Sequence, residues 1–393
     1  MKTRPRLYLL DTLRGLASLS VVIWHYQHFF YVDAGNMKPG FLTNTQPFYS
    51  ALGLFYDHGI EAVQLFFAIS GFVFFFTYYE AISTRRITAW RFAALRFSRL
   101  YPLHLATLLF VAAAQTLSHQ IYGHYIVYQF NDGWHFLAQL FFASHWGFEG
   151  GHSFNGPIWS VSVEIILYAT FFALSHALGT MTRNTFVAAL TMFCLSGTVR
   201  LFPSVDFLSN PVTCFFFGGI SYAIWDAVRL SPAKTRRLVA GGAAIACAAS
   251  LWMYICVEPV SKILYFIAYP SSLLFLALLQ DWFPDLGRRS RLIGDITYAI
   301  YLTHFPIQLA VLLIAKYYGL IIDFYSPVSF LLFFSSVILV SIPIYHYFEL
   351  PMQQLCRRRL LGEAAPVKAG GDAPLFCRRR SWTSRPAVDR RLG

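Results

Sequence analysis

The sequence predicts an all-α, polytopic membrane protein: a bundle of about ten transmembrane helices with both termini in the cytoplasm. The chain has 393 residues, of which 56% are hydrophobic and only 13% are charged. Soluble domains carry roughly 25% charged residues, so a soluble globular protein is nearly excluded. Apolar runs close to the length that crosses a bilayer recur along the chain. Aromatic residues make up 18% of it, which is typical of lipid-facing and interfacial surfaces.

Ten apolar segments are predicted to span the membrane. They are 7–30, 60–79, 100–117, 158–178, 185–202, 212–228, 238–257, 263–280, 294–316 and 327–348. A further apolar stretch, 136–146, is too short to cross a core that needs about 20 residues. This stretch is expected to lie at the interface or to form a re-entrant helix.

The basic residues test this number of spans, because cytoplasmic segments carry an excess of Lys and Arg and one missed span inverts every later loop. With the N-terminus inside, the basic clusters fall on the inner side: 2–6, 85–99, Arg183, 229–237, 288–291 and the tail from residue 357. Arg14 lies within the first span, and the outer segments contain only Lys38, Arg200, Lys262 and Lys316. An eleven-span model would place the clusters at 229–237 and 288–291 outside, so ten spans are preferred.

Two parts of the chain are distinguished by composition. Residues 1–355 are predicted to form one integral-membrane domain, and residues 356–393 a basic cytoplasmic tail rich in Arg, Pro, Gly and Ala. Such a tail is typical of disordered segments and could contact anionic lipid headgroups. The net charge of +12 follows the loop pattern and no nucleic-acid-binding motif accompanies it, so membrane lipids are expected as partners and nucleic acid is not.

No metal site is expected. The six cysteines are scattered, without a C-x-x-C pair or a histidine at zinc spacing. The outer segment 118–157 contains five histidines, but their spacing is irregular.

The first span carries ionisable residues, which are costly within a bilayer and therefore mark functional candidates. Arg14 and His25 are 11 residues apart, about three turns plus 20°, so they share one face about 16 Å apart along the axis. Asp11, Ser18 and His28 extend the polar stripe. Such stripes can also join helices by hydrogen bonds, but a charged pair is expensive for packing alone.

Two further predicted spans carry polar stripes. Ser160, Glu164 and Tyr168 follow one another at i, i+4 and i+8 in the fourth span. Tyr301 and His304 lie in the ninth span, between Thr297 and Gln308. Three helices with aligned polar faces could enclose one cavity. For the ninth span, an equally weighted alternative is that Tyr301 and His304 satisfy each other within the helix packing.

The inner segment before the third span contains five arginines, including Arg96 and Arg99. These two lie one helical turn apart, so both guanidinium groups could face one anion at the membrane surface, as suits phosphate. The alternative is ordinary anchoring of a cytoplasmic segment.

With these residues in view, the sequence resembles the membrane-bound acyltransferase 3 family, whose members acylate sugars and polysaccharides of bacterial envelopes. The matching segments cover about residues 7–355 in the family's order. They are L-D-T-L-R-G-L-A with R-x10-H, Q-L-F-F-A-I-S-G-F-V, R-F-S-R-L-Y-P, P-I-W-S-V-S-V-E, Y-A-I-Y-L-T-H-F-P and F-E-L-P. The resemblance implies a ten-span acyltransferase domain, an acyl-CoA donor and an essential histidine at His25.

The expected function is therefore O-acylation, with acetyl as the expected group and acetyl-CoA as the donor substrate rather than a bound cofactor. The acceptor is expected to be a sugar hydroxyl of an envelope or exported polysaccharide or glycolipid, at the bacterial plasma membrane. The alternative class is a transporter or translocase of a lipid-linked sugar, in which polar stripes would form a substrate path. A third possibility is a structural scaffold in envelope assembly.

Nine residues are predicted to form the site. The expected catalytic residues are His25 as general base, Glu164 and Arg14. Glu164 could orient the imidazole, hold sugar hydroxyls or act as the base itself. Arg96 and Arg99 are predicted to bind the CoA phosphates. The predicted acceptor-binding residues are Ser160, Tyr168, Tyr301 and His304.

Overall fold

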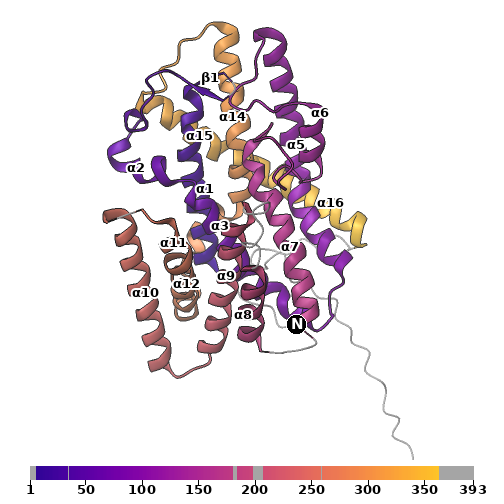
Figure 1. The fold of residues 1–393 in the computed structure, drawn as a ribbon, viewed down its shortest axis with the longest axis vertical. Helices are drawn as coiled ribbons and strands as arrows, with labels where there is room; N and C mark the ends of the chain where they lie inside the picture. The colour runs from indigo at the N-terminus through magenta and orange to yellow at the C-terminus, as the bar shows by residue number, and fades with distance from the viewer. Residues whose placement is uncertain (1–5, 34, 180–183, 198–206, 258, 363–393) are drawn as a thin grey trace, which may run out of the picture.

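A computed structural model describes residues 6–33, 35–179, 184–197, 207–257 and 259–362. The all-α prediction is confirmed: in this part of the chain the strands are limited to β1 (Tyr31–Asp33) and β2 (Asn36–Met37), which form one short antiparallel hairpin. Eight of the described helical segments are long and apolar enough to cross a membrane. The protein is therefore a polytopic helical membrane protein (Figure 1).

Each of the ten predicted spans coincides with a helix. The ten helices are α1 (Tyr8–His25), α3 (Glu61–Phe74), α5 (Ala89–Tyr122), α7 (Trp159–Leu178), α8 (Thr185–Ser196), α9 (Ser209–Val228), α10 (Ala233–Cys256), α12 (Tyr269–Trp282), α14 (Thr297–Tyr318) and α15 (Pro327–Pro343). Helices α1 and α8 are not among the eight apolar segments. The polar stripe of α1 lowers its mean hydropathy, and α8 is only 12 residues long. The end of the predicted span 185–202 lies outside the described residues.

The third span is much longer than predicted. Helix α5 has 34 residues and begins at Ala89, whereas the apolar pattern predicts a start at residue 100. The Thr88 side chain caps the first turn by accepting a hydrogen bond from the Arg91 N–H at 3.2 Å. Arginine lowers the hydropathy of a segment but favours a helix. An apolar pattern alone therefore misses the arginine-rich first part of α5. The two predicted anion-binding arginines consequently lie on a rigid helix.

The structure also contains short helices that the apolar pattern misplaces or misses. The predicted interfacial helix 136–146 is only partly helical, because α6 covers Gly133–Leu140. Its first turn is capped by Asp132, whose carboxylate accepts from the His135 N–H at 3.0 Å. Helix α2 (Tyr49–His58) was not predicted at all. It joins the first two spans together with the β hairpin.

The last span continues beyond its predicted end. Helix α15 passes through the π-helical turn η9 (Ile344–Glu349) into α16 (Leu350–Leu361). The helix thus crosses the predicted domain boundary at residue 355. The remainder of the predicted disordered tail, from residue 363, lies outside the described residues.

In the part of the chain that the structure describes, three π-helical turns interrupt the spans, and each places a side chain against a charged residue. Tyr78 in η3 (Phe75–Tyr79) accepts from Arg96, and Glu349 in η9 pairs with Arg99. In η7 (Leu264–Ala268), Tyr265 donates to Glu61 at 2.6 Å. π-helical turns are rare and frequently lie at functional sites, and here each brings a tyrosine or a glutamate against a charged residue of a neighbouring helix.

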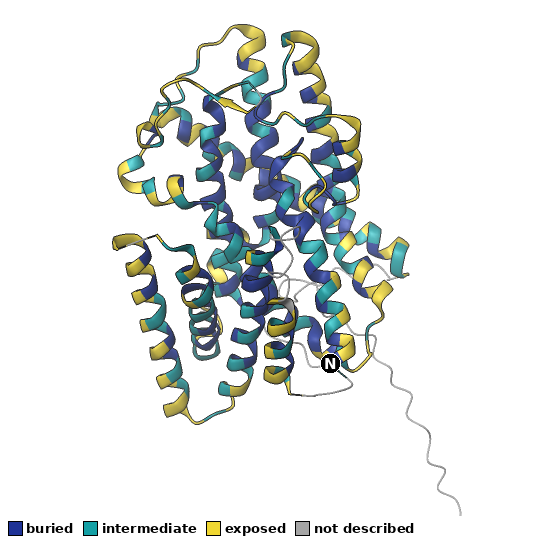
Figure 2. Ribbon diagram, in the orientation of Figure 1, coloured by how far each residue is buried: buried dark blue, intermediate teal, exposed yellow. Residues whose placement is uncertain are grey.

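The centre of the bundle is the packing of α3 against α9. A Cβ atom added to Gly71 would lie 1.7 Å from the Phe215 carbonyl oxygen, and one on Gly218 would lie 1.9 Å from that of Ala68. Only glycine permits this approach, which is a common way for membrane helices to associate. Buried residues line the facing sides of the central helices, whereas α10 lies at the edge with largely exposed positions (Figure 2).

Candidate active site

Three imidazoles meet at the end of α1. His25 is the last residue of α1, His28 follows in the 3-10 turn η1 (Tyr26–Phe30), and His304 comes from α14. The ring centroids of His28 and His304 each lie 4.8 Å from that of His25. The three side chains are 4%, 5% and 0% exposed, respectively. Two helices distant in sequence therefore build one buried histidine cluster.

The backbone fixes the tautomer of His25. Its Nδ1 lies 3.0 Å from the carbonyl oxygen of Val21, one turn earlier in α1. A carbonyl oxygen only accepts hydrogen bonds, so Nδ1 carries the proton and the lone pair is on Nε2. Among the described residues, the ring forms its hydrogen bond through Nδ1. This is the state that a general base requires.

His304 has the same arrangement on α14. Its Nδ1 lies 3.3 Å from the Ile300 carbonyl oxygen. One turn further along α14, the Gln308 amide donates to the His25 carbonyl oxygen at 2.8 Å. This bond ties α14 to the end of α1. Both His25 and His304 therefore present Nε2 in one region of the core.

The predicted acceptor residues Ser160 and Tyr301 are in direct contact. The Ser160 and Tyr301 hydroxyl oxygens are 2.7 Å apart, and the Tyr301 hydroxyl donates to the Pro157 carbonyl oxygen at 2.9 Å. The Tyr301 ring lies 6.1 Å from that of His304. Tyr301 thus bonds to the start of α7 rather than to His304, and this contact brings the polar stripes of α7 and α14 together.

Glu164 lies with the arginines. Its carboxylate accepts a hydrogen bond from Ser70 of α3 at 2.7 Å, and Arg96 and Arg14 are the cations that act on it. The ring of Tyr168, one turn further along α7, stacks on Phe74 with 4.2 Å between centroids. No contact of the described residues joins Glu164 to His25. The candidate carboxylate and the candidate imidazole therefore belong to different parts of the core.

Arg96 and Arg99 share a helix face but contact different partners. The Arg96 guanidinium lies 5.1 Å from the Tyr78 ring centroid and 5.9 Å from that of Tyr168, and it donates to the Tyr78 hydroxyl at 2.8 Å. Arg99 forms an ion pair with Glu349, whose side chain is 2% exposed. Each arginine is thereby held in one direction by its own neighbours.

Arg14 belongs to a third set of contacts, at the start of α1. It donates to the Gly294 carbonyl oxygen at 2.8 Å and lies 3.2 Å from Asp11. Arg6 bridges Asp11 and Asp295, with 2.6 Å to each carboxylate. Arg14 and His25 therefore occupy opposite ends of the polar core, as their spacing along one helix face predicts.

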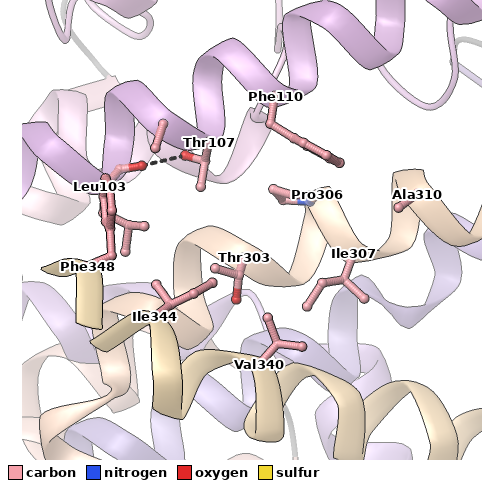
Figure 3. A pocket seen from close by; sticks show the side chains of 11 residues that line it. Leu103, Thr107, Phe110, Thr303, Pro306, Ile307, Ala310, Val340, Ile344 and Phe348 are labelled. Carbon is pink, nitrogen blue, oxygen red and sulfur yellow. Dashed lines mark hydrogen bonds between the residues drawn. The ribbon is translucent and has the colours of Figure 1, made fainter. Parts of the chain in front are cut away.

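An apolar groove of about 410 Å³ lies between α5, α14 and the α15–η9 helix (Figure 3). Its lining includes Leu103, Phe110, Pro306 and Ile344. The residues of α14 that line the groove lie on a different face of this helix from His304 and Gln308. None of the nine predicted site residues lines it.

Several residues of this core were absent from the predicted site. Glu349 belongs to the F-E-L-P segment, but sequence spacing does not connect it to Arg99. Ser70 lies in an apolar segment without any polar periodicity. His28 was visible as the end of the first polar stripe, and its spacing of three residues from His25 was the signal. Among the described residues, no group of His, Cys, Asp or Glu side chains has the arrangement to hold a metal ion.

This geometry defines a class of protein: a membrane helix bundle whose core contains a buried imidazole and a row of arginines. The family model described as an acyltransferase domain matches residues 7–346, so the chain belongs to the acyltransferase 3 family. The chain is also similar to protein 2 in the picA locus of Rhizobium radiobacter, with 34% identity over 108 residues. That match covers 28% of this chain and 45% of the relative, so the chain aligns with less than half of the relative's length. No solved structure matches the chain.

Proposed function

We propose that this membrane acyltransferase moves an acyl group, with acetyl as the expected group, from acyl-CoA to a sugar hydroxyl. The proposed acceptor is an envelope or exported polysaccharide or glycolipid, and the proposed location is the bacterial plasma membrane. The observation that carries the proposal is the His25 imidazole, whose Nδ1 bonds to the Val21 carbonyl oxygen, so that the lone pair is on Nε2 beside His304. The family match favours acyl transfer over the transporter interpretation.

The proposed chemistry uses one proton carrier. Nε2 of His25 takes the proton of the acceptor hydroxyl as its oxygen attacks the thioester carbonyl carbon. The C–O bond forms, the C–S bond breaks, and the CoA thiolate takes the proton from the imidazolium. Protons and electrons balance, so the step requires no further reactant.

The acceptor is proposed to bind between α7 and α14. His304 lies next to His25, and the Tyr301–Ser160 pair follows on the same side of α14. Hydroxyl groups at this depth can bond to the sugar or to the oxyanion that forms during attack. Tyr168 lies one turn beyond Glu164 and would contact the acceptor only at the inner edge of this site.

The donor is proposed to bind near the arginines of α5. The Tyr78 and Tyr168 rings orient the Arg96 guanidinium, and the Glu164 carboxylate acts on the same cation. Arg99 lies one turn away on the same face. CoA phosphates at these residues would leave the neutral pantetheine arm to extend past Arg14 and Glu164 toward His25.

Mass spectrometry of surface glycans tests this proposal. Cells carry no copy, the wild-type chain, or a His25→Ala chain present in the membrane in equal amount. An acyl mass increment found only with the wild type is the expected result. Equal modification with His25→Ala would overturn the role of His25, and no increment in any sample would overturn acyl transfer to a surface glycan.

A matched control separates chemistry from folding. Gln115 is fully buried, and its amide forms two hydrogen bonds with the Ile126 backbone, away from the histidine cluster. Gln115→Leu removes a buried polar side chain without touching the proposed site. It is expected to retain the acyl increment per folded molecule.

A further inference from the structure

A proline lies inside α14, two residues after His304. Proline has no backbone N–H, and its ring crowds the carbonyl group four residues earlier, so that this carbonyl loses its usual helix partner. For Pro306 the carbonyl belongs to Leu302. In a membrane span an unpaired carbonyl is costly because lipid offers no hydrogen bond, and a neighbouring segment commonly supplies the missing donor.

Asn155 supplies this donor. Its side-chain amide donates to the Leu302 carbonyl oxygen at 3.1 Å, although the two residues are 147 positions apart along the chain. Asn155 is 0% exposed, so water does not compete for the bond. The bond connects the loop before α7 to α14 at the turn that Pro306 interrupts.

The loop around Asn155 is itself held in place. The Phe154 N–H donates to the Asn131 side chain at 2.7 Å. A Cβ atom on Gly156 would lie 2.3 Å from the Tyr128 ring, so the backbone next to Asn155 rests directly on that ring. A donor that is fixed in this way also fixes the carbonyl group that it bonds.

His304 lies between two points at which α14 is tied to other segments. Asn155 holds Leu302, two residues before His304. One turn after His304, the Gln308 amide donates to the His25 carbonyl oxygen at 2.8 Å. The His304 and His25 rings are 4.8 Å apart. A displacement at either tie therefore changes how the two imidazoles face each other.

We propose that Asn155 is a positioning residue for the histidine pair: it replaces the helix hydrogen bond that Pro306 removes, and so sets the direction of His304 toward His25. In this role Asn155 acts through α14 and not on a substrate. The inference rests on the proposed function and deepens it, because it identifies a contact outside the reacting groups that keeps His25 and His304 in their arrangement.

A double-mutant cycle tests this role, because Pro306→Ala restores the backbone N–H that can bond the Leu302 carbonyl oxygen. Transfer is measured per folded molecule of the full chain, from radiolabelled acetyl-CoA to glycan isolated from cells that lack the chain. Asn155→Leu removes the donor at similar volume. It is expected to lower kcat about tenfold, as the loss of one hydrogen bond does, without changing the KM for acetyl-CoA. In the Pro306→Ala background the same substitution is expected to lower kcat by about twofold or less.

Equal losses of kcat in the two backgrounds would overturn the proposal, because Asn155 would then act independently of the Leu302 carbonyl. Gln115→Leu is the matched control: it also removes a buried amide that bonds to the backbone, and it should lower stability but not kcat per folded molecule. An Asn155→Leu chain that behaves like this control would have lost a structural bond only, which contradicts a positioning role.

Folding provides the same comparison if Asn155→Leu alone does not fold. The double variant Asn155→Leu with Pro306→Ala is then expected to recover the fold, because the Leu302 carbonyl again has a partner. A double variant that remains as unfolded as the single one would count against the proposal.

Nuclear magnetic resonance of the chain with isotope-labelled histidine reads the arrangement without any transfer. Asn155→Leu is expected to shift the ring signals of His25 and His304, and to leave unchanged those of His104, which is stacked on Phe142. Unshifted signals of His25 and His304 would refute the positioning role and leave the proposed function standing. Shifted signals in a protein whose wild type transfers no acyl group would support the positioning and count against the proposed function.

Discussion

The two ends of the polar core treat their polar groups in opposite ways. At the arginine end, which comprises Arg6, Asp11, Arg14, Arg99, Asp295 and Glu349, the guanidinium groups pair with carboxylates. At the histidine end, which comprises His25, His28, Asn155, His304 and Gln308, buried atoms lack partners among the described residues. The charges at the arginine end neutralise one another, whereas polar atoms at the histidine end are left without hydrogen bonds. Proteins accept such local costs where function needs them.

The largest predicted effect follows from breaking the arginine end. Glu349→Ala leaves the partly buried Arg99 without its carboxylate, so the free energy of unfolding is expected to fall by about 3 kcal/mol, the lower end of the range for breaking a buried pair. Thermal unfolding of the detergent-solubilised chain measures the loss. The double variant Arg99→Met with Glu349→Leu should recover most of this stability, because an apolar pair needs no charge compensation. If the double variant is as unstable as Glu349→Ala, the unpaired charge of Arg99 is not the cause of the lost stability.

The next effect concerns the α3–α9 contact, which is expected to stabilise the fold as a whole and not one end of the polar core. Gly71→Ala places a methyl group against the Phe215 carbonyl oxygen in the α3–α9 contact and should destabilise the fold by about 1 to 3 kcal/mol. The acceptor KM of the remaining folded protein should not change. Gly241→Ala on α10, where no atom lies within 4 Å of the added Cβ, is the matched control. It should be neutral or slightly stabilising, and a loss equal to that of Gly71→Ala would refute the close-packing explanation.

A smaller effect of opposite sign is expected at the histidine end. His28→Leu removes a buried nitrogen that lacks a partner in the described structure, so stability should rise by about 1 kcal/mol while acyl transfer slows. Differential scanning calorimetry and single-turnover transfer separate the two changes. Gln115→Leu, which leaves two Ile126 backbone groups unpaired, should lower stability instead. A His28→Leu chain that is less stable than the wild type and equally active would show that His28 stabilises the fold, as the ion pairs of the arginine end do.

The smallest effect concerns the outer segment next to the histidine end. Burial lowers the pKa of His145 and of His152 below the ordinary value of 6.5, and Glu149 beside His145 offsets part of this shift. The folded state thus binds fewer protons than the unfolded state, so stability should decline as the pH falls below about 6.5 and level off below the folded pKa values.

Hydrogen exchange of residues 141–155 between pH 7.5 and 5 measures this decline. Exchange in α10, which carries no histidine, provides the reference within the same molecule. Unchanged protection of 141–155 across this range would contradict the prediction. Stronger protection at pH 5 would reverse its sign.

The helices were predictable because each span must satisfy its own backbone hydrogen bonds in lipid. This requirement ties helix position to apolar runs of a fixed length, and ten runs gave ten helices. The helical segments that were not predicted lie outside the apolar runs. The start of α5 is rich in arginine, α2 lies between two apolar runs, and the last span continues through η9 to Leu361. Hydropathy does not register helices that are stabilised by caps and packing rather than by lipid.

The site was predictable only in part. The spacing within α1 placed Arg14 and His25 on one face at opposite ends, and the stripe of α14 contained His304. Periodicity within a helix does not say which neighbour a stripe faces, so it did not pair Arg99 with Glu349 or connect Glu164 to Ser70. These contacts join residues that are far apart along the chain.

The sequence by itself determined the all-α membrane bundle, the family and the residue types available for acyl transfer, because hydropathy and motif order are local properties of the chain. Tertiary structure alone decided which charges neutralise one another and which imidazoles lie side by side, because those distances depend on how α1, α5, α7 and α14 pack. Packing assigned partners to the arginines and left acceptors open around His25. That difference separates the arginine end, next to the proposed donor site, from the histidine end, where acyl transfer is proposed to occur.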